Sequence, residues 1–113
     1  MTDHGLVDEE LETIRSVLAN FADEITQVDL FGSRATGNYR GNSDVDLVVH
    51  GDVRDATIDR LRTLFNESNL PLSVDVASYE SMTYRPLKAH VDAVRQCLFS
   101  AQDIRQGKKT RGT

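Results

Sequence analysis

The chain has 113 residues, of which 39% are hydrophobic and 27% are charged, and its formal net charge is −5. This length predicts one domain, and the acidic balance argues against direct nucleic-acid binding, which normally needs a basic face. The one cysteine, Cys97, excludes an internal disulfide and a cysteine-based metal site; without a long apolar stretch or a signal-like start, we expect a cytoplasmic protein with no membrane partner.

Hydrophobic spacing predicts four elements in the first half of the chain. Residues 8–20 have the helical period, with apolar side chains at Leu11, Ile14, Val17, Leu18 and Phe21. Residues 25–31 form a strand that Gly32 ends, and residues 33–37 form a short helix. A loop rich in Gly, Asn and Ser follows to residue 43, and residues 44–50 form the next strand.

The second half continues the alternation of helices and strands. Residues 55–66 are helical, residues 72–78 form a third strand, and a last helix starts at Pro86 and runs to about residue 99. Its inward residues would be Leu87, Val91, Val94 and Leu98. We expect a domain over residues 1–101 and a disordered basic tail over residues 102–113. The order αβαβαβα predicts a small α/β domain with helices on one main face of its sheet.

Three aspartates are predicted to project from one face of that sheet. Alternation sends the apolar residues of the second and third strands to one side, and it sends Asp44, Asp46 and Asp75 to the other. Alternate residues on a strand lie roughly 6.5–7 Å apart. Two carboxylates at that separation repel by about 2–3 kcal/mol at an effective dielectric of 20. Each acid alone also fits a cap or a solvated strand face.

A divalent cation would remove this repulsion. Hard carboxylate oxygens select Mg²⁺ or Mn²⁺. Two such ions can hold both the attacking and the leaving oxygen of a phosphoryl or nucleotidyl transfer. We therefore interpret Asp44, Asp46 and Asp75 as the metal-binding and catalytic residues of a site for a nucleoside triphosphate.

The Gly32-Ser33 step is the predicted phosphate-binding element. Glycine permits backbone angles that other residues avoid and lets a ligand approach the main chain closely. Ser33 then opens the short helix, whose free N–H groups favour phosphate. The same step also fits a plain strand-to-helix turn. Arg34 and Arg40 are candidates for neutralising phosphate charge, although arginines on a surface loop are commonly solvated.

The segments Leu30–Gly37 and Ser43–Leu47 together resemble the minimal nucleotidyltransferase branch of the DNA polymerase β superfamily. The shared pattern is Gly-Ser, a fixed spacing, Asp-x-Asp and a third acid on a later strand, and the resemblance covers residues 10–99. Thr36 departs from it, because many relatives carry a second arginine there.

The resemblance implies a polymerase-β-like core, in which helices flank a small mixed β-sheet. It also implies roles for individual residues. Asp44 and Asp46 would bind two metal ions, Asp75 would bind one of them and assist deprotonation of the attacking hydroxyl, and Gly32 with Ser33 would hold the triphosphate.

Small single-domain members are similar to the antitoxin half of toxin–antitoxin pairs whose toxin has a HEPN domain. The resemblance implies transfer of AMP from ATP to a tyrosine of a HEPN ribonuclease toxin, with which the chain would form a hetero-oligomer. The 113 residues leave little for a second domain that grips another acceptor.

Two other functions remain open from the sequence. The first is a nucleotidyltransferase for a small molecule such as an aminoglycoside. The second is a non-catalytic module that neutralises its toxin by contact. The scattered histidines His4, His50 and His90 are interpreted as structural or exposed, and Tyr39 as either a base-stacking or a surface residue.

Overall fold

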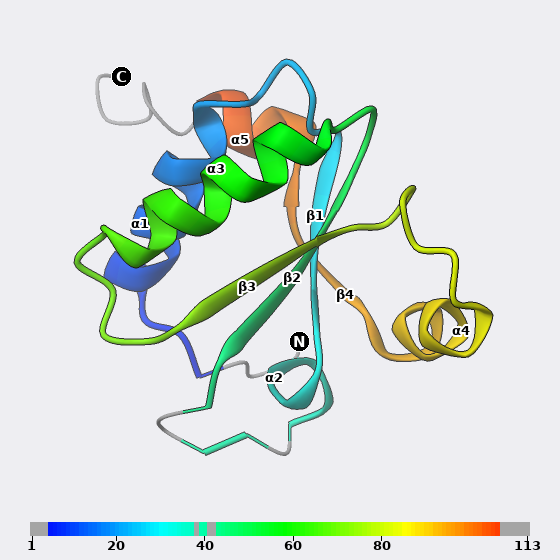
Figure 1. The fold of residues 1–113 in the computed structure, drawn as a ribbon. Helices are drawn as coiled ribbons and strands as arrows, with labels where there is room; N and C mark the ends of the chain where they lie inside the picture. Colours follow the sequence, from blue (N-terminus) through cyan, green and yellow to red (C-terminus); the bar gives the residue numbers. More distant parts are fainter. Residues whose placement is uncertain (1–4, 38, 41–42, 107–113) are drawn as a thin grey trace.

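Strand β2 (Val45–His50) is an inner strand of a four-stranded sheet with the order β3-β2-β1-β4. The computed structural model describes residues 5–37, 39–40 and 43–106. Strand β1 (Gln27–Phe31) pairs antiparallel with β2 and with β4 (Gln96–Ser100). Strand β3 (Val74–Ser78) pairs parallel with β2, so the sheet is mixed and β3 forms one of its edges (Figure 1).

Three helices cover one face of the sheet: α1 (Asp8–Ala19), α3 (Asp55–Asn66) and α5 (Ala101–Gln106). The alternation of β2 directs Val45, Leu47 and Val49 toward them, and all three side chains are fully buried. The core under these helices also includes Ile14 and Leu18 of α1, Leu61 and Phe65 of α3, and Val76 of β3. This apolar layer fixes which side of each strand remains for polar residues.

The other two helices lie away from this layer. Helix α2 (Ser33–Thr36) follows β1 directly at the end of the sheet, and α4 (Arg85–Val94) lies on the other side of the sheet from α1 (Figure 1). Val48 of β2 alternates away from the main core and is still fully buried, as is Val91 of α4. The second face is therefore covered in part, and its remainder is polar.

The predicted order is confirmed as far as α4, and the predicted mixed sheet is confirmed. The bounds of α3 agree with residues 55–66, and α1, β1, β2 and β3 differ from their predicted ranges by two residues or fewer at each end. Leu87 of α4, expected to face inward, is 42% exposed.

The C-terminal part of the prediction was wrong in two respects. The last helix ends at Val94, and residues 96–100 form β4 beside β1 instead of continuing the helix to residue 99. The tail was expected to lack structure from residue 102, but residues 101–106 form α5, in which Ile104 is fully buried. The rest of that predicted tail, residues 107–113, lies outside the described residues.

Within the described ranges, none of the helices combines the length and the apolar composition that crossing a bilayer requires.

Candidate active site

Asp46 and Asp75 lie next to each other on the polar face of the sheet. They are paired residues in the parallel register of β2 and β3, and neighbouring strands are about 4.8 Å apart. Asp44 precedes β2 by one position, so it lies two residues before Asp46. Asp46 is partly buried, whereas Asp44 and Asp75 are exposed. The backbone therefore brings together the three acids that the sequence selected.

The position of Asp46 beside Asp44 and Asp75 affects its pKa. Its pKa is raised above the ordinary aspartate value, first because burial disfavours the charged form, and then because the negative charges of Asp75 and Asp44 repel it. A proton or a cation would relieve the same repulsion. The donor set consists of hard carboxylate oxygens, which fit Mg²⁺ or Mn²⁺ better than a soft metal.

The side chains do not form a closed cage. Within residues 5–37, 39–40 and 43–106, no group of three or more His, Cys, Asp or Glu side chains is placed so that it could hold a metal ion. Asp75 instead pairs with Arg62 of α3, with 3.7 Å between Asp75 Oδ1 and Arg62 Nε. The strand register keeps Asp46 and Asp75 adjacent in the backbone, although in this structure the three carboxylates are not arranged as a metal cage.

Gly32 occupies the end of β1 beside Asp46. Its backbone angles, φ 77° and ψ −155°, fall in a region that is essentially restricted to glycine. A Cβ atom at this position would collide with the Asp46 carboxylate. Ser33 follows as the first residue of α2, which has no side-chain cap at its N-terminus. The Gly-Ser step thus lies against Asp46, as the spacing predicted.

Arg34 is buried and ties α2 to the start of β2. Only 1% of the residue is exposed, and its Nε and Nη2 donate hydrogen bonds of 3.2 and 3.0 Å to the carbonyl of Ser43. Its guanidinium also lies over the ring of Tyr39, 4.9 Å from the centroid. These contacts hold the residue before Asp44 in place. Nucleotide binding by Arg34 stays a prediction.

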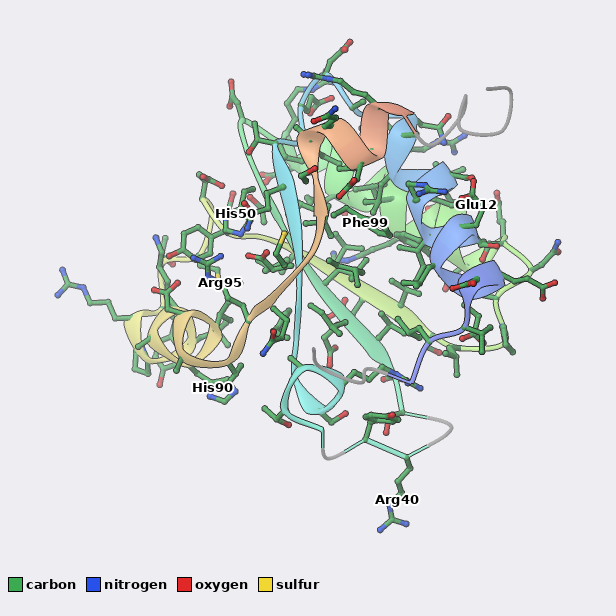
Figure 2. The ribbon with its side chains drawn as sticks, turned by 180° about the vertical axis from the view of Figure 1, so that it is seen from behind. Glu12, Arg40, His50, His90, Arg95 and Phe99 are labelled. Atoms are coloured by element: carbon green, nitrogen blue, oxygen red, sulfur yellow. The ribbon has the colours of Figure 1, made fainter. Side chains whose placement is uncertain are left out.

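Arg40 lies near the tip of the loop and points away from the body of the protein (Figure 2). Its backbone N–H donates to Ser43 Oγ at 2.7 Å, and the Ser43 N–H donates to the Arg40 carbonyl at 3.0 Å. The loop is thereby closed just before Asp44. Phosphate binding by the exposed Arg40 side chain also stays a prediction. Tyr39 is partly buried and contacts Arg34, so it is not a freely exposed surface residue.

Sequence reasoning missed two polar residues near these acids. Arg62 pairs with Asp75 and also donates a 2.9 Å hydrogen bond to the carbonyl of Val76. Asp29 of β1 is fully buried on the polar face. The only available signals were the position of Asp29 between Val28 and Leu30 and the spacing of Arg62 on α3.

Asp29 is the centre of a hydrogen-bonded network. His50 Nε2 and Arg95 Nη1 each lie 2.6 Å from Asp29 Oδ2, and Gln27 donates to Oδ1 at 2.7 Å. Burial alone would raise the pKa of Asp29, but the hydrogen bonds from Gln27, His50 and Arg95 outweigh it and lower that pKa. Figure 2 shows His50 and Arg95 side by side. The His50 side chain is 14% exposed and contacts Asp29, and its structural role stays a prediction.

Comparison with known proteins identifies a nucleotidyltransferase family and a sequence relative. The family described as polymerase beta, nucleotidyltransferase matches residues 12–104. A probable protein adenylyltransferase, MntA of Haemophilus influenzae, is 34% identical over 84 residues, which cover 70% of this chain and 73% of that protein.

Solved structures share the fold. A toxin–antitoxin crystal structure with AMP-PNP superimposes with a TM-score of 0.66 at 18% identity, covering 89% of this chain and 93% of the other. A mutant of an MntA–HpeT toxin–antitoxin complex gives a TM-score of 0.65 at 18% identity, covering 95% and 87% of the two chains. At these identities the likeness concerns the fold alone.

Proposed function

This chain belongs to the polymerase beta nucleotidyltransferase family, and from that premise we propose that it transfers AMP from ATP to a hydroxyl group of a partner protein. The observation that carries the proposal is the register that places Asp46 beside Asp75, with Gly32 against Asp46. Asp44 precedes them on the same strand end. Three acids next to a glycine-lined turn can bind a triphosphate through divalent cations and main-chain groups.

The proposed roles follow from exposure and position. Asp44 and Asp46 hold two Mg²⁺ or Mn²⁺ ions, which when bound neutralise phosphate charge and stabilise the attacking and leaving oxygens. Gly32 lets the triphosphate approach the main chain, and Ser33 offers its N–H and hydroxyl. Asp75, which is exposed on the neighbouring strand, accepts the proton of the acceptor hydroxyl. That oxygen forms a bond to the α-phosphorus as the bond from the α-phosphorus to the leaving pyrophosphate breaks.

The partner is proposed from the names of the relatives. The most informative sequence relative is called a probable protein adenylyltransferase, and two of the solved structures of this fold are toxin–antitoxin complexes. We infer that the acceptor is a toxin encoded beside this chain, a HEPN ribonuclease modified on tyrosine. Modification would silence the toxin, so the chain would act as an antitoxin by catalysis.

The test uses the co-expressed pair and ATP labelled in the α-phosphate. Wild-type protein with Mg²⁺ or Mn²⁺ is expected to add at least one AMP to the partner, measured by intact-mass spectrometry, and EDTA should abolish the transfer. Asp46→Asn should reduce transfer by at least about a hundredfold, because a metal ligand is lost while repulsion within the fold is relieved.

Asp23→Asn is the matched control, because Asp23 is an exposed aspartate outside the site. It should retain full transfer. Retained transfer by Asp46→Asn would contradict the assignment of the site. An unmodified partner alongside adenylylated small molecules would reassign the acceptor, and a toxin neutralised equally by Asp46→Asn would indicate a non-catalytic module.

A further inference from the structure

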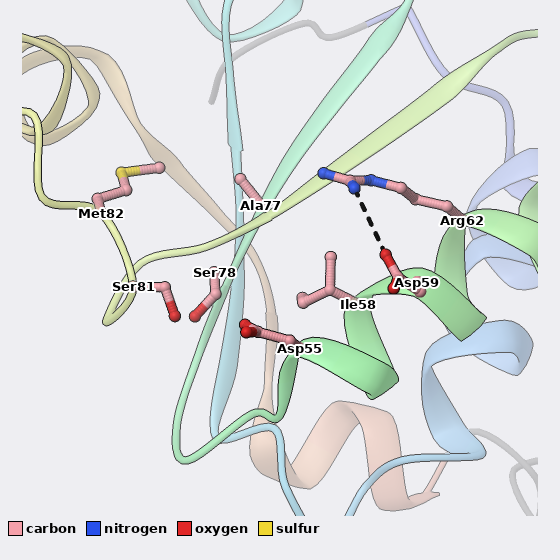
Figure 3. A pocket seen from close by; sticks show the side chains of 8 residues that line it. All are labelled: Asp55, Ile58, Asp59, Arg62, Ala77, Ser78, Ser81 and Met82. Atoms are coloured by element: carbon pink, nitrogen blue, oxygen red, sulfur yellow. Dashed lines mark ion pairs between the residues drawn. The ribbon is translucent and has the colours of Figure 1, made fainter.

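A pocket lies between α3 and the C-terminal end of β3, apart from the acid cluster. Its volume is about 340 Å³, and its walls come from one face of α3, the last residues of β3 and the turn that follows (Figure 3). Asp55, the first residue of α3, stands on one side, and Ser78 and Ser81 stand on the other. None of these residues belongs to the acid cluster of Asp44, Asp46 and Asp75.

One side-chain hydroxyl in this pocket, that of Ser78, lacks a hydrogen-bond partner in the described part of the chain. Ser78 is 7% exposed, and its buried Oγ has no hydrogen-bond partner there. Figure 3 shows this hydroxyl, the Ser81 hydroxyl and the Asp55 carboxylate pointing toward one another. A buried hydroxyl without a partner is costly, so this arrangement is expected to receive hydrogen bonds from a ligand.

The charge of the pocket favours a cation. Its charged residues are Asp55, Asp59 and Arg62, which sum to −1 because two aspartates face one arginine. Arg62 is already engaged, with Asp59 at 3.8 Å and Asp75 at 3.7 Å. Asp55 is therefore the carboxylate that remains available to an incoming positive group.

The polar groups of the pocket, the Asp55 carboxylate and the Ser78 and Ser81 hydroxyls, suit a primary ammonium group. A primary ammonium carries three N–H donors and no acceptor, and this pocket offers one carboxylate and two hydroxyl oxygens. Ile58 and Met82 give the same pocket an apolar wall that can receive a methylene stem. We propose that this pocket binds the ammonium group of a lysine side chain on the acceptor protein, which anchors that protein beside the acids.

The position of the pocket explains why an anchor there would matter. Ser78 lies three residues beyond Asp75 on β3, about 10 Å along the strand, and faces the helices, whereas Asp75 faces the other side of the sheet. The pocket and Asp75 are therefore linked at the edge strand β3. Arg62 lines the pocket and also pairs with Asp75. A protein held by its lysine would thus present a nearby hydroxyl to Asp75. This role as an acceptor anchor rests on the proposed function.

The first test measures ammonium binding without any transfer reaction. The whole chain is titrated with n-butylammonium chloride, and amide shifts are followed by NMR at constant ionic strength. Saturable shifts are expected at residues 55, 78 and 81. They should weaken about tenfold in Asp55→Asn, as expected for the loss of one charged hydrogen-bond acceptor, and persist in Asp23→Asn.

Ser78→Ala separates binding from folding. Removing a buried hydroxyl without a partner should leave the melting temperature unchanged or raise it, yet butylammonium binding should weaken. The absence of saturable shifts in the wild type, equal binding by Asp55→Asn, or equal shifts with magnesium chloride would each overturn the ammonium site.

The second test identifies the source of the ammonium group. In AMP transfer to the partner, Asp55→Asn should raise the KM for the partner about tenfold with kcat and ATP affinity unchanged. Acetylating the lysines of the partner should raise the wild-type KM and remove the difference between the two enzymes. If acetylation has no effect, the partner is not the source and free alkylamines remain the ligand, which overturns the anchor.

The two proposals fail in different ways. If wild-type protein modifies the partner and Asp55→Asn has an unchanged KM, the anchor is overturned and the proposed function stands. If wild-type protein transfers no AMP, the proposed function is overturned, and the titration with butylammonium decides whether the pocket binds an ammonium group.

Discussion

At the scale of single residues, the site depends on the contact between Gly32 and Asp46. Gly32 combines a positive φ with a position where a Cβ would meet the Asp46 carboxylate. Gly37, at the other end of α2, also has a positive φ of 87°, but a Cβ there would meet nothing within 4 Å. Substituting Gly37 would therefore introduce backbone strain alone, whereas substituting Gly32 would also push a Cβ against Asp46.

Gly32→Ala is expected to lower the free energy of unfolding by about 1–3 kcal/mol, because alanine disfavours these backbone angles, and to weaken binding of Mg²⁺–ATP by displacing Asp46. Gly37→Ala should cost about 1–2 kcal/mol with nucleotide binding unchanged. Urea denaturation and calorimetric titration measure the two effects. Equal loss of nucleotide binding in both variants would count against a role of Gly32 in the site.

At the scale of elements, α3 begins with a cap supplied from far along the chain. Its N-cap residue, Arg54, makes no side-chain cap of its own. Glu24 instead accepts hydrogen bonds from the Arg54 N–H at 3.1 Å and from Thr57 Oγ1 at 2.8 Å, and it pairs with the Arg54 guanidinium. The hydrogen bonds from Arg54 lower the pKa of Glu24 from 4.5 to about 2.

Glu24→Gln should therefore reduce the free energy of unfolding by about 1–2 kcal/mol at pH 7. Because the folded pKa of Glu24 is lowered, its contribution is complete above the unfolded value of 4.5 and is lost as the pH falls toward about 2. The difference between wild type and variant should shrink below pH 4.5 in urea titrations. Asp23→Asn, at the exposed neighbouring residue, should leave the free energy of unfolding at pH 7 unchanged within about 0.5 kcal/mol.

Helix α4 is attached to the rest of the protein by polar contacts of Arg95 and Asp92. Arg95, the residue after α4, reaches the buried carboxylate of Asp29, and Tyr79 donates to Asp92 of α4 at 2.7 Å. The apolar contribution is small by comparison, since Val91 is the one buried residue described on α4. The orientation of this helix thus depends on charged groups.

Arg95→Met is expected to lower the free energy of unfolding by about 3 kcal/mol, because it leaves a buried carboxylate with less compensation. Arg85→Met is the control, since Arg85 is exposed on the same helix, and it should change stability by less than about 0.5 kcal/mol. Chemical denaturation measures both variants. Similar values for the two would mean that the Asp29 network does not hold α4.

At the scale of the whole molecule, the C-terminal segment completes the core. Strand β4 adds Phe99 to the apolar layer, and α5 adds Ile104. Phe99 pairs with Val28 of β1, 71 residues earlier in the chain, and α5 packs against α1. The domain therefore needs residues up to Gln106, not to 101 as the sequence indicated.

Ile104→Ala should cost about 2–4 kcal/mol, because a fully buried side chain is removed and leaves a cavity. A chain shortened to residues 1–106 should keep the melting temperature of the full chain. Differential scanning calorimetry compares them, with Gln102→Ala as an exposed control in α5. An unchanged melting temperature in Ile104→Ala would contradict the assignment of α5 to the core.

The sequence by itself determined the features that depend on neighbouring residues. The alternation of Val45, Leu47 and Val49 decided which face of β2 is buried and hence where Asp46 points. The Gly32-Ser33 step and the helical period of residues 55–66 are equally local, and the structure agrees with them. The resemblance to the nucleotidyltransferase family rested on the same short segments, and the family match over residues 12–104 confirms it.

Only the tertiary structure decided the features that arise from pairing across the chain. The helical spacing of Leu87, Val91, Val94 and Leu98 predicted a longer helix. Residues 96–100 instead pair with β1, and Arg95, which follows the helix, contacts Asp29. Arg62 met Asp75 in the same way. These contacts join segments that are far apart in the chain, so no local sequence pattern predicts them. Their stabilising free energy comes from burial and hydrogen bonds that form only once the strands have assembled.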